Sequence, residues 1–261
     1  MQARHINRKQ YFEELAITSR KYHVPLIRHY HGIPLGSRIL EIGSGDGGNL
    51  LPFAEMGCEV VGVDLSATRI RDARCFFEDR HVYGRFVEAD ILAQPDLGEP
   101  YDIIICHDVY EHIENKSRLL KVMGHYLKPD GIVFIAFPAW LMPFGGHQQI
   151  CHNPVISKVP FIHLLPEVAY RYLLRLSGES PECITELLSI KQTKVTIEEF
   201  EKHIEGSVLF IAHRDLWLIN PHYEIKFGMK AMKLHPIIAG IPYIRNLLSS
   251  SCGYVLKRHD G

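Results

Sequence analysis

Residues 38–48 read Arg38-Ile39-Leu40-Glu41-Ile42-Gly43-Ser44-Gly45-Asp46-Gly47-Gly48, a short apolar run that ends in a glycine-dense turn. The apolar run predicts a β-strand, and the segment after the turn has a helix-like pattern. Glycine has no Cβ and tolerates positive φ, so such a turn lets bare backbone approach a ligand closely. A strand, a glycine turn and a helix in this order predict a nucleotide-type cofactor site.

A second apolar run, residues 59–63, ends on a carboxylate, Asp64. This acid follows the first glycine by about 20 residues, the distance at which a βαβ unit places the residue that binds a ribose. The turn and the acid together predict an adenosine-containing cofactor. They leave the donor open, because Gly43-x-Gly45-x-x-Gly48 also fits the fingerprint of a dinucleotide site.

The composition is that of an ordinary globular protein. The chain has 261 residues, of which 46% are hydrophobic and 23% charged, and we expect one elaborated domain or at most two. A formal net charge of -1 gives no field that would gather a polyanion, so we expect no nucleic-acid partner. The longest apolar stretch, residues 132–144, contains Pro138 and Pro143 and is too short for a transmembrane helix.

Cysteine usage and the first residues bear on the compartment. The six cysteines form no CxxC pair, and no leading segment has the pattern of a secretory signal. We therefore expect free thiols and a cytoplasmic location.

Apolar strands alternate with helical segments along most of the chain. This rhythm predicts an α/β fold with a doubly wound, mostly parallel sheet of seven strands. We expect helices over 8–30, 48–56, 66–80, 115–127 and 196–206, and strands over 37–42, 59–63, 84–88, 102–106, 132–137, 207–219 and 254–256. Lys128-Pro129-Asp130-Gly131 is predicted to be a turn.

The rhythm changes after the fifth strand, where prolines, aromatic residues and leucines accumulate. We interpret this part as a helical lid inserted there to bind the substrate. The predicted organisation is N-terminal helices over 1–34, a cofactor-binding α/β core over 35–137, the lid over 138–195, and a C-terminal part over 196–261 that completes the sheet.

Five short segments follow one another in order between residues 41 and 131. They are Glu41-x-Gly43-x-Gly45-x-Gly47, Val63-Asp64-Leu65-Ser66, Val87-Glu88-Ala89-Asp90-Ile91, the segment from Tyr101-Asp102 to Glu111-His112, and Leu127-Lys128-Pro129-Asp130-Gly131. This series resembles the motifs of class I S-adenosylmethionine-dependent methyltransferases. A dehydrogenase would leave the third and fifth segments unexplained, so we favour S-adenosylmethionine over NAD as the cofactor.

The resemblance implies roles for residues at the strand ends. The glycine turn would face the carboxylate-bearing tail of the cofactor with backbone N–H groups, and Asp64 would accept hydrogen bonds from the ribose. Leu65 and Ile91 would pack against the adenine and Asp90 would accept from its amine. The full set implied to bind the cofactor is Glu41, Gly43, Ser44, Gly45, Gly47, Asp64, Leu65, Asp90, Ile91 and His107.

Histidines dominate the candidates for catalysis. Transfer from a sulfonium needs mainly alignment in a dry pocket, and a base helps when the acceptor is a hydroxyl. His147 is our first candidate for that base, because it follows Gly145-Gly146 where the lid leaves the sheet. Glu111 and His112 resemble the Glu-His pair of many small-molecule methyltransferases, in which the pair shapes the site. A loop or core role for His147 stays open.

Two other chemistries deserve less weight. His147, Cys151 and His152 match no common zinc spacing, so we predict no metal. A cage of aromatic rings could bind the sulfonium by cation–π attraction, with Tyr11, Tyr22, Tyr30 and Trp140 as candidates.

The sequence therefore predicts a methyltransferase that acts on a small molecule or a glycan precursor, with oxygen the favoured acceptor atom. Residues 143–149 resemble a segment of bacterial methyltransferases from surface-polysaccharide pathways. The apolar stretch 161–176 leaves open a lipid or quinone acceptor and contact with a membrane surface. A cofactor-binding partner subunit without chemistry of its own is the remaining alternative. The oligomeric state is not predicted.

Overall fold

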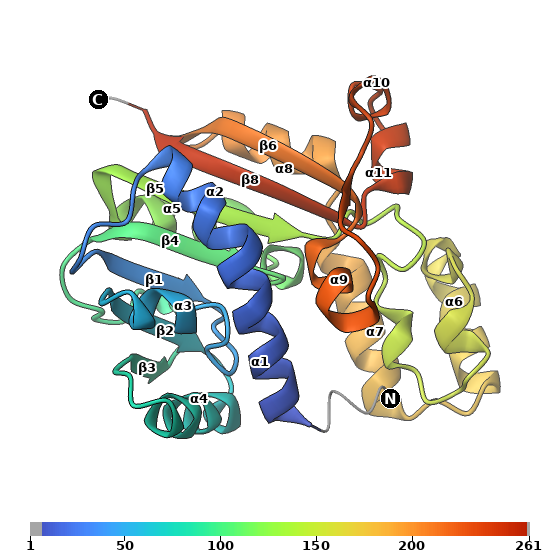
Figure 1. The fold of residues 1–261 in the computed structure, drawn as a ribbon. Helices are drawn as coiled ribbons and strands as arrows, with labels where there is room; N and C mark the ends of the chain where they lie inside the picture. Colours follow the sequence, from blue (N-terminus) through green and yellow to red (C-terminus); the bar gives the residue numbers. More distant parts are fainter. Residues whose placement is uncertain (1–6, 260–261) are drawn as a thin grey trace.

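A computed structural model describes residues 7–259, and Figure 1 shows a twisted central sheet with helices on both faces. The sheet has eight strands in the order β3-β2-β1-β4-β5-β8-β6-β7. The strands are β1 (Arg38–Ile42), β2 (Glu59–Asp64), β3 (Arg85–Glu88), β4 (Tyr101–His107), β5 (Leu127–Phe137), β6 (Leu209–Ile219), β7 (Met232–Lys233) and β8 (Ser251–Arg258).

The predicted fold class is confirmed. Strands β1 to β5 pair in parallel, whereas β8 lies antiparallel between β5 and β6. The predicted count of seven strands was one too low. The eighth, β7, has two residues and pairs with the end of β6, where Trp217 lies opposite Lys233. A strand this short leaves no alternation in the sequence to detect.

Helices flank the sheet throughout. They are α1 (Arg8–Thr18), α2 (Val24–Tyr30), α3 (Leu51–Glu55), α4 (Ala67–Asp79), α5 (Lys116–Tyr126), α6 (Glu167–Leu176), α7 (Pro181–Thr193), α8 (Ile197–Glu205), α9 (Pro221–Phe227), α10 (Pro236–Ala239) and α11 (Ile244–Leu248), with a π-helical turn, Ser19–His23, between α1 and α2. Side chains cap several of them; Ser66, for example, accepts from the N–H of Arg69 at the start of α4.

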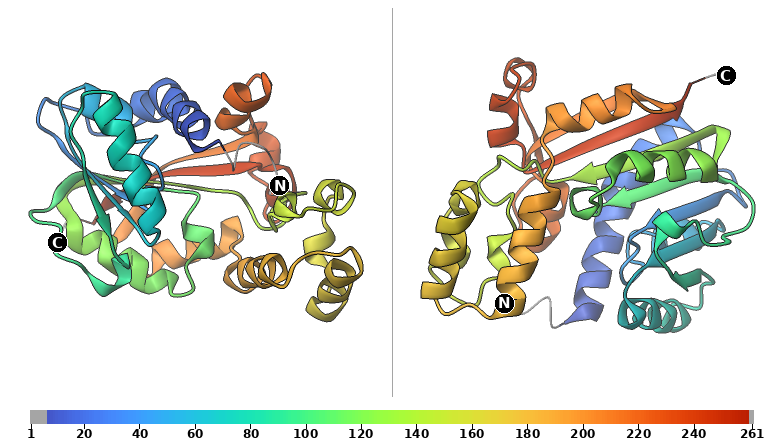
Figure 2. Two further views of the ribbon diagram at one scale, coloured as in Figure 1. Left: turned by 90° about the horizontal axis from the view of Figure 1, so that it is seen from below. Right: turned by 180° about the vertical axis from the view of Figure 1, so that it is seen from behind.

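Successive residues of the central strands feed two separate cores. Ile39 of β1 packs with helices α1 to α4, whereas its neighbour Leu40 packs with α5 and α8. The same alternation holds for Ile103 and Ile104 in β4. Figure 2 shows these two helical layers on opposite faces of the sheet. Burial on both faces explains why the strands read as nearly continuous apolar runs.

Two element boundaries differ from the prediction. The segment 128–131 is the start of β5 and not a turn, because the strand already begins at Leu127, which pairs with Tyr101 across a register shift. The predicted helix 48–56 is shortened to α3, since the chain makes turns through residue 50 after the last glycine. In both places the amino-acid composition is typical of a different element from the one that forms.

The segment 138–195 lies beyond the carboxyl end of β5, where Figure 1 draws α6 and α7 at the right of the molecule. It has an apolar cluster of its own. That cluster includes Ile162, Tyr170, Leu174, Ile184 and Leu187.

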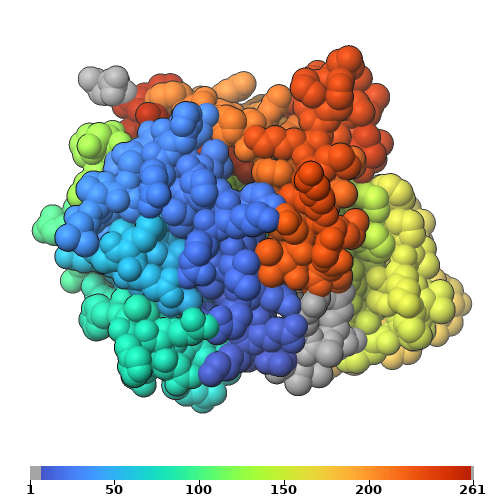
Figure 3. Space-filling view, viewed as in Figure 1, coloured from blue at the N-terminus to red at the C-terminus, as the bar shows by residue number. Residues whose placement is uncertain are grey.

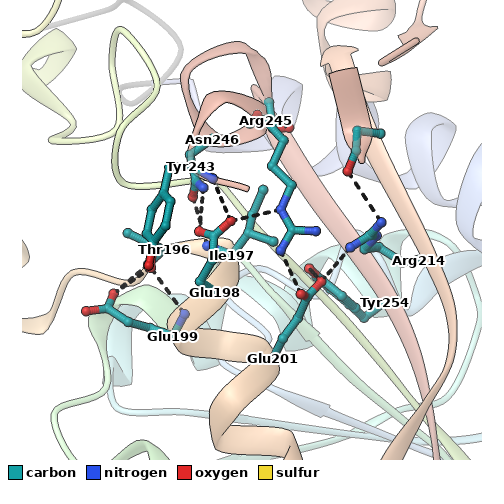
Figure 4. A network of polar contacts seen from close by, with 12 residues as sticks. Thr196, Ile197, Glu198, Glu199, Glu201, Arg214, Tyr243, Arg245, Asn246 and Tyr254 are labelled. Atoms are coloured by element: carbon teal, nitrogen blue, oxygen red, sulfur yellow. Dashed lines mark hydrogen bonds and ion pairs between the residues drawn. The ribbon is translucent and has the colours of Figure 1, made fainter. Parts of the chain in front are cut away.

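A polar network fastens α8 to the strands behind it (Figure 4). The carboxylate of Glu201 accepts from Arg245 at 2.7 Å, from Arg214 at 2.7 Å and from the hydroxyl of Tyr254 at 3.1 Å. The neighbouring Glu198 accepts from Arg245 at 2.9 Å. Because the Arg245 side chain is 8% exposed, its charge depends on these two carboxylates. The network holds β6, β8 and α11 to one helix.

Substitution of two separate glycines, Gly43 and Gly32, tests how tightly the turn after β1 is packed. Gly43 has φ +69°, and a Cβ built there would lie 2.2 Å from the Cγ2 of Val109, whereas Gly32 has φ +77° with open space around it. We expect Gly32→Ala to lower the free energy of unfolding by about 1 kcal/mol through backbone strain alone, and Gly43→Ala by about 2–4 kcal/mol. Urea unfolding measures both. Equal losses would show that Val109 moves aside and that the packing is loose.

Candidate active site

The turn after β1 is folded back on the end of β2. The carbonyl of Val63 accepts from the N–H groups of Gly43 at 2.7 Å and Ser44 at 3.0 Å. Gly43, Gly45 and Gly47 all have positive φ, as the predicted close approach of backbone to a ligand requires. The missing Cβ of Gly43 lets the turn contact Val109, so the loop after β4 lies directly against it.

Asp64 is fixed at the end of β2 by the turn itself. Its Oδ2 accepts from the N–H of Gly45 at 2.9 Å, and its Oδ1 accepts from the N–H of Ser66 at 2.9 Å. The residue stays partly exposed. A carboxylate held on both oxygens and open to solvent is preorganised to accept further hydrogen bonds from a ligand.

Glu41 lies beneath the turn and is buried. Its Oε1 accepts from the Nδ2 of Asn49 at 2.8 Å, while Oε2 has no hydrogen-bond partner among residues 7–259. Burial raises the pKa of Glu41 to about 8, with the negative charge of Asp64 adding to the shift and the bond from Asn49 opposing it. The carboxyl group is therefore largely protonated at neutral pH.

The remaining residues expected at the cofactor lie along the same edge of the sheet. Asp90 is exposed and its Oδ1 accepts from the N–H of Leu92 at 2.8 Å, while Ile91 is buried beneath it. Leu65 is 72% exposed. The side chain of His107 is 7% exposed, and its Nδ1 lies 3.3 Å from Asp108.

Helix α1 contributes side chains that the motifs did not indicate. Arg8 forms ion pairs with Asp46 of the turn and, at 2.9 Å, with Asp72 of α4. Tyr11 is near enough to Asp108, Arg69 and Asp46 for their charges to act on its hydroxyl, whose pKa burial raises above the usual range.

Of the four aromatic residues proposed for a sulfonium cage, Tyr11 is the one with these neighbours. Tyr22 packs on Trp217, Tyr30 on His213 and Trp140 on His163.

Helix α9 lies beside α1 over this region, as Figure 3 shows in orange and blue. The ring of His222 stands edge-on to Tyr11 with centroids 5.9 Å apart, and its Nδ1 is 3.0 Å from the hydroxyl of Thr18. Segments far apart in the sequence thus meet over the glycine turn.

The three residues named as catalytic candidates come together in one cluster, although His147 follows His112 by 35 positions in the sequence. His147 stands just before a short 3-10 turn, Gln148–Ile150. The Oε1 of Glu111 lies 3.7 Å from the Nε2 of His112 and 4.0 Å from the Nε2 of His147. The two imidazole rings are nearly perpendicular, with centroids 5.1 Å apart. We call Glu111, His112 and His147 the histidine–carboxylate cluster.

Unusual backbone brings these side chains together. Asp108 and His147 both adopt positive φ, at 54° and 57°. Before His147 the chain passes so close to its surroundings that a Cβ on Gly145 would lie 2.3 Å from the carbonyl oxygen of Trp140, and one on Gly146 would lie 2.1 Å from the Cβ of His163. The pair of glycines is therefore required for this approach, and positive φ costs free energy in a residue other than glycine.

Burial controls the protonation of the cluster. It lowers the pKa of His147 to about 4, assisted by His112, and also lowers the pKa of His112. Burial and then the charge of Asp108 raise the pKa of Glu111 well above its usual range. At Glu111 the low dielectric thus disfavours the charged form, and at His147 likewise, whereas the side chain of His112 is 39% exposed.

Cys151 and His152, considered with His147 for a zinc site, belong to a different group. Cys151 lies with Glu179 and Cys183 inside the segment 138–195. Burial raises the pKa of Cys151 to about 12 and that of Cys183 to about 11. The carboxylate of Glu179 is occupied by the N–H groups of His152 and Asn153, at 3.0 and 2.8 Å. All six cysteines are free thiols, as expected.

The structure also bears on membrane insertion. Within residues 7–259, no helix has the length and apolar character needed to cross a bilayer.

Comparison with known proteins places the chain among methyltransferases. A family model described as a methyltransferase domain matches residues 10–175. An uncharacterized methyltransferase of Mycobacterium tuberculosis is 32% identical over 116 residues, which are 44% of this chain and 45% of that protein. A ubiquinone biosynthesis O-methyltransferase of Chelativorans sp. is 38% identical over 101 residues, 39% of this chain and 40% of that protein. The chain thus matches less than half the length of these relatives.

One solved structure matches nearly the whole chain. A S-adenosylmethionine-dependent methyltransferase from Clostridium acetobutylicum aligns over 99% of this chain and 96% of its own, with a TM-score of 0.57 and 11% identity. At this identity the likeness shows a shared fold.

The buried carboxyl of Glu41 makes a prediction about stability and pH. Its folded pKa of about 8 lies above its ordinary value of 4.5, so the folded state binds the extra proton between these values. The contribution of the protonated Glu41 carboxyl to the free energy of unfolding is fully present below pH 4.5, and it is lost as the pH rises towards 8. Glu41→Gln keeps an acceptor for Asn49 and removes the titration. We expect the variant to gain on the wild type by at most about 1.4 kcal/mol per pH unit across this window.

Urea unfolding of both proteins at several pH values between about 5 and 8 measures this difference in the free energy of unfolding. A constant difference across these pH values would show that the Glu41 carboxyl titrates alike in the folded and unfolded states.

Proposed function

We propose a function from one premise, that this chain belongs to the methyltransferase-domain family. The family predicted from the sequence motifs is thereby confirmed. The proposed reaction is transfer of a methyl group from S-adenosylmethionine to a hydroxyl of a small acceptor. The observation that supports it is the contact of the glycine turn with Val109 in the loop after β4, because a cofactor bound at this turn would lie beside the histidine–carboxylate cluster that follows in the same loop.

The donor side has the groups that the cofactor needs. The N–H groups of Gly43 and Ser44 are bonded to Val63, and that of Gly45 to Asp64, so the amino-acid tail of the cofactor would lie against the bare backbone of the glycine turn. Asp64 would accept from the ribose hydroxyls, with its carboxylate already held by Gly45 and Ser66. Asp90 is exposed and available to the adenine amine. Tyr11 supplies an aromatic ring near the turn for the sulfonium.

The acceptor side is formed by the cluster and the segment 138–195. Methyl transfer is an in-line displacement in which the acceptor oxygen attacks the methyl carbon and the sulfonium sulfur leaves with the bonding pair, so alignment supplies much of the rate. The hydroxyl must also lose its proton. We propose that Glu111, His112 and His147 act on that hydroxyl, and proton removal by His147 is the simplest form of this role.

The acceptor class we favour is a small hydroxylated molecule or a glycan precursor. Support comes from the polar character of the cluster, in which two imidazole nitrogens lie 3.7 and 4.0 Å from one carboxyl oxygen. The segment 138–195 would close over this acceptor.

A lipid or quinone acceptor is the second candidate, and helix α6 favours it. Val168, Tyr172 and Leu176 recur at i, i+4 and i+8 and are 82%, 63% and 68% exposed. This apolar stripe next to the acceptor side would suit a lipophilic substrate or a membrane surface. One relative is named as a ubiquinone biosynthesis O-methyltransferase.

Cofactor binding is tested by stability and by a charge change at Asp64. At about 100 times its dissociation constant, S-adenosylmethionine should stabilise the fold by roughly 2.7 kcal/mol. We expect Asp64→Asn to weaken binding by about tenfold to a hundredfold, because it removes a charged acceptor. Asp79→Asn is the matched control, since Asp79 is exposed on α4 and pairs with Lys9. Equal affinities in titration calorimetry for both variants would overturn the assignment of Asp64.

Turnover tests the acceptor side. We expect His147→Asn to lower kcat by about 10²–10⁴-fold with little change in cofactor affinity, and asparagine tolerates the positive φ at this position. His152→Ala is the control, because His152 is 56% exposed and outside the cluster. The assay follows S-adenosylhomocysteine release with a panel of sugars, nucleotide sugars, catechols and quinols.

Turnover with quinols alone would select the second candidate. Cofactor binding without turnover on any acceptor would favour the partner-subunit reading, and loss of cofactor affinity in His147→Asn would move His147 to the donor side.

A further inference from the structure

The carboxylate of Glu111 is buried without the partners that a buried carboxylate requires. The residue is 4% exposed, and neither of its oxygens accepts a hydrogen bond from any residue that the structure describes. Placing an acidic group in the interior with no compensating contact is costly, and such groups are normally paired or bound to a metal. A cation or a hydrogen-bond donor bound at this carboxylate would supply the missing partner.

Two imidazole nitrogens lie near the same carboxylate oxygen. The Nε2 atoms of His112 and His147 lie 3.7 and 4.0 Å from the Oε1 of Glu111, and the three residues each offer one ligand atom within 4.8 Å of the others. Bonds of about 2.0–2.2 Å to one metal ion would hold such ligand atoms roughly 3–3.6 Å apart. The cluster needs to contract by up to about 1–2 Å to reach that geometry, which changes in side-chain torsions can supply.

We propose that Glu111, His112 and His147 bind a divalent transition-metal cation, with Zn²⁺ and Mn²⁺ as the best candidates. Imidazole nitrogen and carboxylate oxygen are the ligands that these ions accept. Three protein ligands leave at least one coordination position open, which is the pattern of a catalytic site and not of a closed structural one.

This inference rests on the proposed function, because it names how the acceptor hydroxyl is activated. The hydroxyl oxygen takes the open position on the cation, which lowers its pKa, and its proton leaves to solvent. The oxygen then forms a bond to the methyl carbon while the carbon–sulfur bond breaks and its electron pair stays on sulfur. A methyl ether and S-adenosylhomocysteine result. The cation takes over the role first assigned to His147 as a base, since a coordinated Nε2 has no lone pair for a proton.

The second group of potential ligands serves as an internal control. Cys151, Glu179 and Cys183 also place ligand atoms within 4.8 Å of one another. In that group the carboxylate of Glu179 already accepts from two backbone N–H groups and lies 3.3 Å from the Nδ1 of His152. Its carboxylate has partners, so nothing there calls for a cation.

Metal binding can be measured apart from activity. The full chain is stripped with a chelator, dialysed and titrated with Mn²⁺, followed by calorimetry and by the loss of the free-ion signal in electron paramagnetic resonance. We expect one bound Mn²⁺ per chain, at least about tenfold weaker binding in Glu111→Gln and His147→Asn, and unchanged binding in Cys183→Ser. Glu111→Gln should fold, because the carboxylate it replaces makes no hydrogen bond with the residues described. If it does not, His147→Asn provides the same measurement.

Three outcomes would overturn the proposal: no Mn²⁺ or Zn²⁺ bound by the wild type, binding that survives in both cluster variants, or binding that is lost in Cys183→Ser instead. Failure here is distinguishable from failure of the proposed function. Turnover that persists in chelator, with no cation bound, removes the metal and leaves the methyltransferase. Absence of S-adenosylmethionine binding removes the function whatever the cation does.

Discussion

One carbonyl group organises the end of the sheet at which chemistry is expected. The oxygen of Val63 accepts from two successive N–H groups, those of Gly43 and Ser44, and so folds the chain back as it leaves β1. The reversal brings Gly45 to the carboxylate of Asp64 and places Gly43 against Val109. Because parallel strands end at the same edge, this single turn brings the proposed donor site, the loop after β4 and the histidine–carboxylate cluster together.

Most of the fold could be read from apolar runs, because a parallel sheet buried on both faces leaves continuous hydrophobic strands in the sequence. Two features of the fold were not predicted. The strand β7 is too short to carry a pattern, and Pro129, Asp130 and Gly131 have turn composition yet form the start of β5. Pairing of Leu127 with Tyr101 overrides composition there, and pairing between distant segments cannot be seen in a local window.

Spacing indicated the donor side, since motifs at strand ends have fixed separations. It could not indicate the contribution of α1, whose Arg8 reaches Asp46 and whose Tyr11 lies near Asp108, because those contacts depend on how a helix packs over the sheet. The residues proposed for the acceptor side were predicted one at a time. That Glu111 would be buried between two imidazoles, with neither oxygen hydrogen-bonded to a described residue, depends on the strained approach of His147. This arrangement is why we propose a metal site, whereas the sequence predicted none.

The position of β8 in the sheet bears on the order in which parts of the sheet fold. In the half that holds the glycine turn, paired residues are 21 positions apart between Arg38 and Glu59 and 64 apart between Ile39 and Ile103. The insertion of β8 next to β5 joins Ile132 to Lys257, which are 125 positions apart. Contacts between distant residues cost more loop entropy and form more slowly. The donor half can therefore assemble early as a βαβ unit, and the strands that complete the sheet close it late. The proposed donor site would then be in place before β6 and β8 complete the sheet.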